Sequence, residues 1–587
     1  MFGPINSDGA EDLLLDGSEE ASYVWPGKDG NGNGNGSSSL EDELMYRDSA
    51  SRLSLTEFEV SPHKTSAEIN LIEASKWLDP YSPGNRSIFA SYLSVGFGLY
   101  FIQTPLAFYM VNSLSCSPAT QAVITGLLSL PWALKIFCGF LSDSVPIFGL
   151  RRKPYFILGW CTFAACNAFL ASLVNPGVLM LAVFLFLGSL GFVLADVCTD
   201  AMIVERSKLY EHTGNQGTLQ ATGYIIRFFG GIIGAAAGAA LYNKASWGWG
   251  LSMWVIFVIN AAVPLGFILP FVYQLVEVRA EAPPQLRQQV ASIWALVQKR
   301  AVWRPCSFIY IYNVLLLQNP AWNSFLVAGL GFSNFDIGLL TLSGAILSYV
   351  ALVVYKRYLF DVSWRLVYLF ATTFSFVFTC LQLVLVLRLN TKIGMSSVGY
   401  ELLFAMGSYG VVMFVQSIQF LPACRMFLGM CPSGAEGASY AMLTTLSNLA
   451  GTVSYSLAAA CSSIWDVSIP TLESGNYEGM WKLTLLCGSV QLTGLLFLFL
   501  LPSGVAEQVR RLVCLLFLPV CCSCLRLAHS LIFAHHPPDP PTHPPTHAAQ
   551  LAMQRNSSSS KQAGAAFLFV IFSSLVFVIS YTFLTID

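Results

Sequence analysis

Apolar runs long enough to cross a bilayer recur along most of this chain, and no other feature limits its fold as strongly. A spanning helix needs about 20 mostly apolar residues. Twelve runs qualify, and they centre on residues 88–111, 118–141, 155–174, 177–203, 217–241, 250–275, 306–330, 336–355, 366–388, 398–422, 437–462 and 481–501. They predict an all-α polytopic membrane protein with twelve transmembrane helices, arranged as six, a linker and six.

The distribution of charge supports this prediction and suggests an orientation. Only 11% of the 587 residues are charged, against about 25% in a typical soluble domain. Basic residues gather in alternate loops, as in Arg151–Lys153, Arg206–Lys208 and Lys356–Arg357. Because cytoplasmic loops carry an excess of lysine and arginine, we expect these loops and the N-terminus to face the cytoplasm.

Five segments follow from this reading. Residues 1–86 hold 16 of the 33 acidic residues and a Gly/Asn/Ser run, which predicts a disordered acidic cytoplasmic tail. We expect an N-terminal six-helix half at 87–276 and a C-terminal six-helix half at 305–502. Between them, 277–304 is predicted to be a cytoplasmic linker with an amphipathic helix. The tail at 503–587 ends in a candidate thirteenth membrane helix, "AAFLFVIFSSLVFVISYTFL", and either a genuine extra anchor or a mistaken gene model would explain it.

The two halves resemble each other weakly, which favours two six-helix pseudo-repeats. "GTLQATGYIIRFFGG" in the fifth run can be laid over "GASYAMLTTLSNLAG" in the eleventh, so that Gly217 matches Gly437. Arg227 then falls opposite a serine beside Asn448, and Asp196 falls opposite Gln416. Transporters built from such repeats bind their substrates near the bilayer midplane, between the repeats.

Ionisable residues inside the predicted spans are the strongest functional signal. Asp196 and Asp200 share one face of the fourth helix, and Arg227 on the fifth lies at similar depth. A charge at the bilayer centre costs about 2.5–3.5 kcal/mol, so these groups should face the bundle interior, either as a structural salt bridge or as a substrate or proton site. Lys135 on the second helix either snorkels to the interface or faces the same cavity. The candidate substrate- or proton-binding residues are Asp196, Asp200, Arg227, Lys135, Gln220, Gln416 and Asn448.

A second set of residues lies near the predicted cytoplasmic ends and suggests a gating loop. Its candidates are Gly139, Asp143, Arg151, Arg152, Lys153, Glu205 and Glu436. Asp143 ends a helix, where a negative charge is disfavoured, so it needs a partner, and the basic cluster ten residues on can supply one. Glu205 is predicted to form an interfacial ion pair, and Glu436 either caps the eleventh helix or contributes to gating.

Two further patterns predict packing without chemistry. Gly230, Gly234 and Gly238 form a small-xxx-small face on the fifth helix, which is typical of a close helix–helix seam. Trp132 is predicted to mark a membrane interface.

Enzymatic chemistry is disfavoured, and no metal or cofactor is expected. All seven histidines lie outside the twelve spans, so intramembrane metal or acyl-transfer chemistry lacks its usual ligands and bases. An aspartate-dyad protease needs its two aspartates on facing helices, whereas Asp196 and Asp200 share one helix.

Five stretches of the chain, taken in order, resemble the folate–biopterin transporter family, a major facilitator superfamily-like group. They are "LPWALKIFCGFLSDSVPIFGLRRKPY", "FVLADVCTDAMIVERSK", "GTLQATGYIIRFFGGIIG", "GLGFSNFDIGLL" and "MCPSGAEGASYAMLTTLSNLAG". The first also resembles the loop signature of major-facilitator carriers. The resemblance implies transport of folates, biopterin or, in some members, S-adenosylmethionine. It maps an acidic helix-four motif onto Asp196 and Asp200, and a helix-five arginine onto Arg227.

We therefore expect a secondary-active transporter of pteridines that works by alternating access, with proton coupling left open. Its expected partners are a small-molecule substrate such as folate or biopterin, protons and the lipid bilayer, and no nucleic acid. A carrier of another solute, such as S-adenosylmethionine, a sugar or an amino-acid-like metabolite, and a non-transporting receptor or scaffold are the alternatives. We expect a multi-pass protein of the plasma membrane or an endomembrane.

Overall fold

The computed structural model describes residues 77–584, apart from 115, 117, 212–216, 243–247, 278–285, 393, 395–397, 432–435 and 502–558. All described residues belong to one compact unit that spans Thr65–Asp587. Most of the predicted acidic tail and of the segment from 503 onward therefore lies outside the described residues. Residues 77–86 are described, and the first long helix begins at Pro83, within the segment that the sequence assigns to the tail.

Helices make up the described part of the chain, with two isolated β-bridges and no strand among the described residues. The elements of the first half are α3 (Pro83–Phe101), α4 (Gln103–Phe108), η1 (Tyr109–Ser113), α5 (Pro118–Ala133), α6 (Lys135–Ser144), α7 (Lys153–Ser172), α8 (Val178–Tyr210), α9 (Thr218–Leu241) and α11 (Met253–Val272). The linker contains α12 (Leu286–Val297), at the position of the predicted amphipathic helix.

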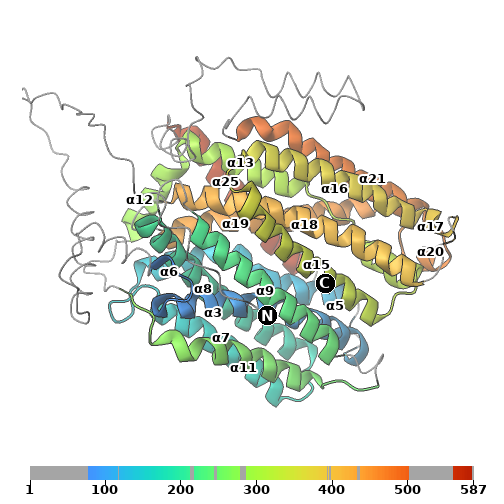
Figure 1. Ribbon diagram of the computed structural model, residues 1–587, viewed down its shortest axis with the longest axis horizontal. Coiled ribbons are helices and arrows are strands. Elements are labelled where there is room, and N and C mark those ends of the chain that lie inside the picture. Colours follow the sequence, from blue (N-terminus) through green and yellow to red (C-terminus); the bar gives the residue numbers. More distant parts are fainter. Residues whose placement is uncertain are drawn as a thin grey trace, which may run out of the picture. The chain divides into compact units, whose positions relative to one another are not determined.

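The second half continues the helical pattern (Figure 1). Its elements are α13 (Arg300–Leu315), α14 (Trp322–Ser324), η2 (Phe325–Gly329), α15 (Asn334–Val354), η3 (Tyr355–Leu359), α16 (Trp364–Val386), α17 (Leu389–Lys392), α18 (Val398–Met430), α19 (Glu436–Ser462), α20 (Ile469–Glu473), α21 (Glu478–Thr493) and η4 (Gly494–Leu500). A last helix, α25 (Lys561–Leu584), follows.

The described helices fit a polytopic membrane protein without settling the number of crossings. Within the described residues, nine helices are long and apolar enough to cross a membrane, and a tenth span results if α5 and α6, bent by 41°, count as one. α25 is among the nine. The other predicted spans fall on α3, α13 and α19, of which α13 has only 16 residues and the other two carry more polar side chains.

A glycine seam joins α3 to α9, as the small-xxx-small pattern predicts. A Cβ atom on Gly230, Gly234 or Gly238 would lie 2.1–2.4 Å from a backbone oxygen of α3. Gly96 on α3 faces the same seam, because its Cβ would lie 1.6 Å from the Arg227 carbonyl oxygen. The backbones therefore approach more closely than any larger side chain permits.

The first and second halves meet along two helix pairs. α9 packs against α15, where Ala239 Cβ would lie 3.0 Å from a Cβ on Gly338. In η3, which follows α15, the Lys356 ammonium donates to Thr222 Oγ1 of α9 at 2.6 Å. α6 and the end of α5 pack against α19. The fifth predicted span thus contacts the eighth, and the second contacts the eleventh. In a six-plus-six repeat the fifth span corresponds to the eleventh and the second to the eighth, so each of these two contacts is the counterpart of the other. The contact between α9 and α15 is visible in Figure 1.

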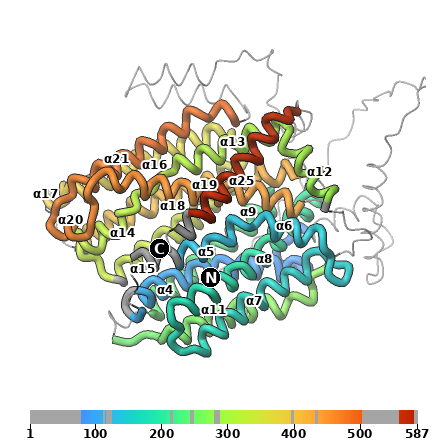
Figure 2. Tube along the Cα trace, turned by 180° about the vertical axis from the view of Figure 1, so that it is seen from behind, coloured from blue at the N-terminus to red at the C-terminus, as the bar shows by residue number. Residues whose placement is uncertain are grey.

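The C-terminal helix α25 packs where helices of both halves meet. It contacts α5 of the first half, α13 and α19 of the second, and the linker helix α12 (Figure 2). Its buried residues are Phe567, Ile571, Ser574, Leu575 and Val578. Ser574 Oγ forms a hydrogen bond of 2.6 Å with the Tyr310 hydroxyl, and Ser560 N–H donates to the Gln298 carbonyl at 2.9 Å.

Candidate functional site

Four charged side chains of the first half meet inside the helix bundle, and we call them the charged cluster. Lys135, at the start of α6, donates to Asp196 Oδ2 at 2.7 Å and to Asp200 Oδ2 at 2.8 Å. Arg227 of α9 donates to Asp196 Oδ1 at 2.9 Å. The four-residue spacing on α8 puts both carboxylates on one face, and α6 and α9 deliver a cation on either side. Asp196, Asp200 and Arg227, which the sequence predicts to lie at similar depth, are therefore brought into one ion-pair network.

The charged cluster is nearly sealed from its surroundings and is neutral overall. The side chains of Asp196, Asp200 and Lys135 are 0–4% exposed, whereas that of Arg227 is 14% exposed. Two carboxylates balance two cations, which is the arrangement that makes buried charge tolerable. Lys135 does not snorkel to an interface, because it is enclosed between the two aspartates.

Tyrosines surround Asp200 and connect the charged cluster to the second half. Tyr92 of α3 donates to Asp200 Oδ1 at 2.8 Å, and the Tyr224 hydroxyl lies 3.4 Å from the same oxygen. Tyr224 in turn shares a hydrogen bond of 3.3 Å with Tyr440 of α19. The predicted site residue Gln220 donates to Tyr440 at 3.1 Å. Sequence reasoning missed all three tyrosines, since tyrosine is common in spanning helices and nothing in their spacing marks them.

Trp132, which the sequence predicts at a membrane interface, lies beside the charged cluster. The centroid of its ring is 5.6 Å from Lys135 Nζ and 5.5 Å from the Arg227 guanidinium carbon. Cations at this range are attracted by the negative face of an indole ring. The predicted site residue Asn448 of α19 donates to the Trp132 carbonyl at 3.2 Å, so a second contact between the halves lies here.

Gln416 remains apart from this arrangement. It is half-buried on α18, and among the described residues no hydrogen bond or ion pair connects it to the charged cluster. Its position is one helical turn from Met413 on the same helix.

A second polar assembly closes the end of the bundle that carries Arg151–Lys153, which we call the basic end. Arg152 forms ion pairs with Asp143 and, at 2.8 Å, with Glu205. The basic cluster Arg151–Lys153 thus supplies the partner that the sequence analysis expects for Asp143. Burial by itself would lower the pKa of the Arg152 guanidinium, but the charges of Asp143 and Glu205 raise it well above its ordinary value, so Arg152 stays charged.

Asp143 also reaches across to the second half. Its Oδ2 atom accepts a hydrogen bond of 2.6 Å from the Ala438 backbone N–H, in the first turn of α19. First-turn N–H groups have no partner within their own helix and attract negative charge. An aspartate that is unfavourable at the end of α6 is therefore stabilised by the start of another helix. We call Asp143, Arg152, Glu205 and this first turn of α19 the gate, after the gating role that the sequence predicts for these three side chains.

Glycines make the close contact at the gate feasible. A Cβ on Gly139 would lie 2.8 Å from Ala441 Cβ and 2.9 Å from the Gly437 carbonyl oxygen. A Cβ on Gly437 would lie 2.6 Å from an Arg152 nitrogen. Both positions therefore lack room for any side chain in this structure.

The remaining predicted gating residues surround this assembly. Glu436, the first residue of α19, lies 3.9 Å from the Lys208 ammonium, which also donates to the Cys431 carbonyl. Glu277, which sequence reasoning missed, accepts hydrogen bonds of 2.7 Å from the backbone N–H groups of residues 151, 152 and 153. Glu277 thus caps the start of α7 and holds the basic loop in place.

Comparisons with known proteins agree with this architecture. The model of the BT1 family matches residues 95–511. The folate-biopterin transporter of a Synechocystis species is 28% identical over 425 residues, which cover 69% of this chain and 81% of that protein. Probable folate-biopterin transporter 2 of Arabidopsis thaliana is 24% identical, covering 68% and 78%. Folate transporter 2 of Plasmodium falciparum is 25% identical, covering 65% and 80%.

Together with the apolar helices, these matches identify an integral membrane protein with several spans. The matched relatives are transporters and not enzymes. Because the family model covers well over half of the sequence, this chain belongs to the BT1 family.

Proposed function

We propose that this protein is a secondary-active carrier of folate- and biopterin-type pteridines, and that it works by alternating access between two six-helix halves. The observation that carries the proposal is the neutral charged cluster, which is buried in the first half and bonded through Tyr224 to Tyr440 of the second. A change in the charge of this cluster alters contacts across the interface between the halves. The names of the relatives supply the substrate class.

The proposal includes twelve spans in the two halves, 87–276 and 305–502, joined by the cytoplasmic linker 277–304, with α25 as a thirteenth. Arg151–Lys153 and Lys208 lie at the basic end, which supports a cytoplasmic location for this end and for the N-terminus. The plasma membrane and an endomembrane are both compatible with this topology.

Substrate binding acts, in this proposal, on Arg227. It is the most exposed member of the charged cluster, so an anionic group such as the glutamate tail of folate meets it first. If Arg227 turns toward the substrate, Asp196 and Asp200 share Lys135 alone. A proton can compensate for this deficit of positive charge, which would couple transport to a proton gradient.

The gate determines which side of the membrane the site can reach. While Asp143 accepts from Ala438, α6 and α19 are held together at the basic end. Release toward the cytoplasm requires this hydrogen bond to break and α19 to move away from Gly139. Tyr440 lies on the same helix, so occupancy of the charged cluster and the state of the gate are mechanically linked.

The test is uptake of labelled folate, biopterin and S-adenosylmethionine into a host that lacks its own transport of them. We expect uptake of folate or biopterin by the wild-type protein, and loss of it in Asp196→Asn and Arg227→Ala at equal amounts in the membrane. Glu478→Gln is the matched control, because this carboxylate is exposed at the start of α21. Faster uptake at an acidic external pH would support proton coupling.

Two results would contradict the proposal in different ways. Absence of pteridine uptake, together with robust uptake of an unrelated solute, would overturn the substrate class. Wild-type rates in both cluster variants would leave the substrate class intact but remove the charged cluster from the mechanism.

A further inference from the structure

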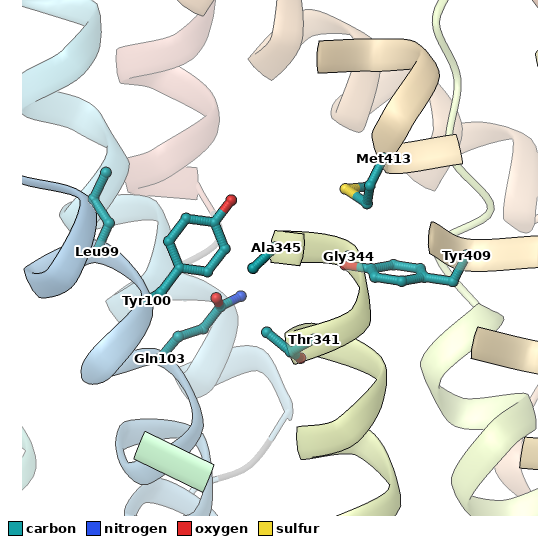
Figure 3. A pocket seen from close by; sticks show the side chains of 8 residues that line it. All are labelled: Leu99, Tyr100, Gln103, Thr341, Gly344, Ala345, Tyr409 and Met413. Atoms are coloured by element: carbon teal, nitrogen blue, oxygen red, sulfur yellow. The ribbon is translucent and has the colours of Figure 1, made fainter. Parts of the chain in front are cut away.

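A cavity of about 410 Å³ lies between α3, α4, α15 and α18, and sequence reasoning singled out none of the residues that line it. Ligand sites commonly enclose about 300–1,000 Å³. Figure 3 shows Tyr100 of α3 and Gln103 of α4 on one side, Tyr409 and Met413 of α18 on the other, and α15 between them. Residues from both halves therefore line this cavity.

Glycines fix the positions of its two aromatic rings. A Cβ on Gly231 of α9 would lie 2.9 Å from Tyr100 Cδ2, and one on Gly344 of α15 would lie 2.7 Å from Tyr409 Cε1. Each tyrosine ring thus packs directly against a helix backbone where no side chain intervenes. Rings held in this way are already ordered before a ligand arrives, which lowers the entropic cost of binding.

The cavity lies next to the charged cluster along α9. Gly231, which contacts the Tyr100 ring, is one helical turn beyond Arg227 on α9. A ligand in the cavity can therefore extend a flexible side chain toward Arg227, the most exposed charge of the cluster.

We infer that this cavity binds the flat heteroaromatic ring of the substrate, an inference that rests on the proposed function. Tyr100 and Tyr409 supply aromatic faces for a two-ring heterocycle. The exposed Gln103 amide offers a donor and an acceptor to the amino and ring N–H edge of a pterin. Met413 adapts its thioether to the outline of the ring. The charged cluster then receives the polar tail and the cavity selects the ring.

The test is the concentration dependence of folate uptake by tyrosine variants of the full-length protein. Stacking on an aromatic side chain changes affinity by about 5- to 150-fold per ring, so Tyr100→Ala and Tyr409→Ala should each raise KM by at least about fivefold. Tyr409→Phe keeps the ring and should stay within about twofold of the wild type. Tyr455→Ala is the control, because this tyrosine is 58% exposed on α19.

A glycine pair tests the same inference without removing a ring. Gly344→Ala pushes on Tyr409 and Met413 and should raise KM, whereas Gly407→Ala, whose Cβ meets nothing within 4 Å, should not. The amount of each variant in the membrane and its melting temperature in detergent show whether it has folded.

Competition by fragments separates this inference from the proposed function. Free pterin should inhibit folate uptake by the wild-type protein and lose that effect in Tyr409→Ala. An aminobenzoyl-glutamate fragment, which lacks the pterin ring, should inhibit both equally. If the wild-type protein takes up folate and the folded tyrosine variants have its KM, the cavity inference is overturned and the proposed function stands. If the wild-type protein takes up no pteridine, both are overturned.

Discussion

Neutralisation of Asp196 tests whether the charged cluster is a structural salt bridge or part of the transport mechanism. Asp196 contacts Lys135 at 2.7 Å and Arg227 at 2.9 Å. At an effective dielectric constant of about 20, each contact corresponds to about 6 kcal/mol of attraction. Asp196→Asn loses both and recovers the desolvation cost of one carboxylate, so we expect a net loss of about 3–5 kcal/mol in stability.

A second substitution restores the charge balance without restoring the carboxylate. In Asp196→Asn with Arg227→Gln, Lys135 and Asp200 remain as a neutral pair at 2.8 Å. We therefore expect the double variant to recover most of the lost stability, measured as the melting temperature of the purified protein. Uptake of folate should stay absent in both variants, because both lack the Asp196 carboxylate and the double variant also lacks the guanidinium that meets the anionic tail.

The two measurements refute different parts of this reasoning. If Asp196→Asn melts at the wild-type temperature, the cluster does not depend on charge balance. If the double variant is stable and regains wild-type uptake, the four charges serve only to hold α6, α8 and α9 together. Glu478→Gln, an exposed carboxylate paired with a lysine one turn away, should change neither quantity.

Three further predictions concern packing. Gly139→Ala places a Cβ 2.8 Å from that of Ala441. This clash should favour an open basic end by about 1–3 kcal/mol. The expected result is faster cysteine labelling at the gate, and unchanged labelling would contradict this. Gly234→Ala should lower the melting temperature because its Cβ would lie 2.4 Å from a carbonyl oxygen of α3, whereas Gly451→Ala, with nothing within 4 Å, should not. Deletion of 559–587 should lower the melting temperature but permit membrane insertion, since α25 packs against helices of both halves; a truncated protein that melts like the full chain would show that α25 is dispensable.

Hydrophobicity and helical periodicity along the sequence determined much of the fold. Runs of about 20 apolar residues predict spanning helices because a bilayer leaves backbone groups no partner except their own helix. The glycine spacing on the fifth span predicted a close seam for a similarly local reason. The number of membrane crossings was harder to predict from hydrophobicity, because α13 is short and α19 is rich in small and polar residues.

The sequence also indicated part of the site. Charge inside a spanning segment is costly, so Asp196, Asp200 and Arg227 could be recognised from position alone, and their depths followed from the rise of a helix. For Lys135 the same reasoning left two outcomes open. Its place between two carboxylates depends on how α6 approaches α8, and no local pattern specifies that approach.

Only the tertiary structure decided the contacts between the halves. Asp143 caps a helix that starts almost 300 residues later, and Tyr440 reaches a carboxylate network of the other half through Tyr224. The cavity beside Tyr100 and Tyr409 likewise exists only where α3, α4, α15 and α18 converge. The physical reason is that the local sequence shows which polar groups would cost free energy to bury. The partner that offsets this cost comes from packing between segments distant along the chain.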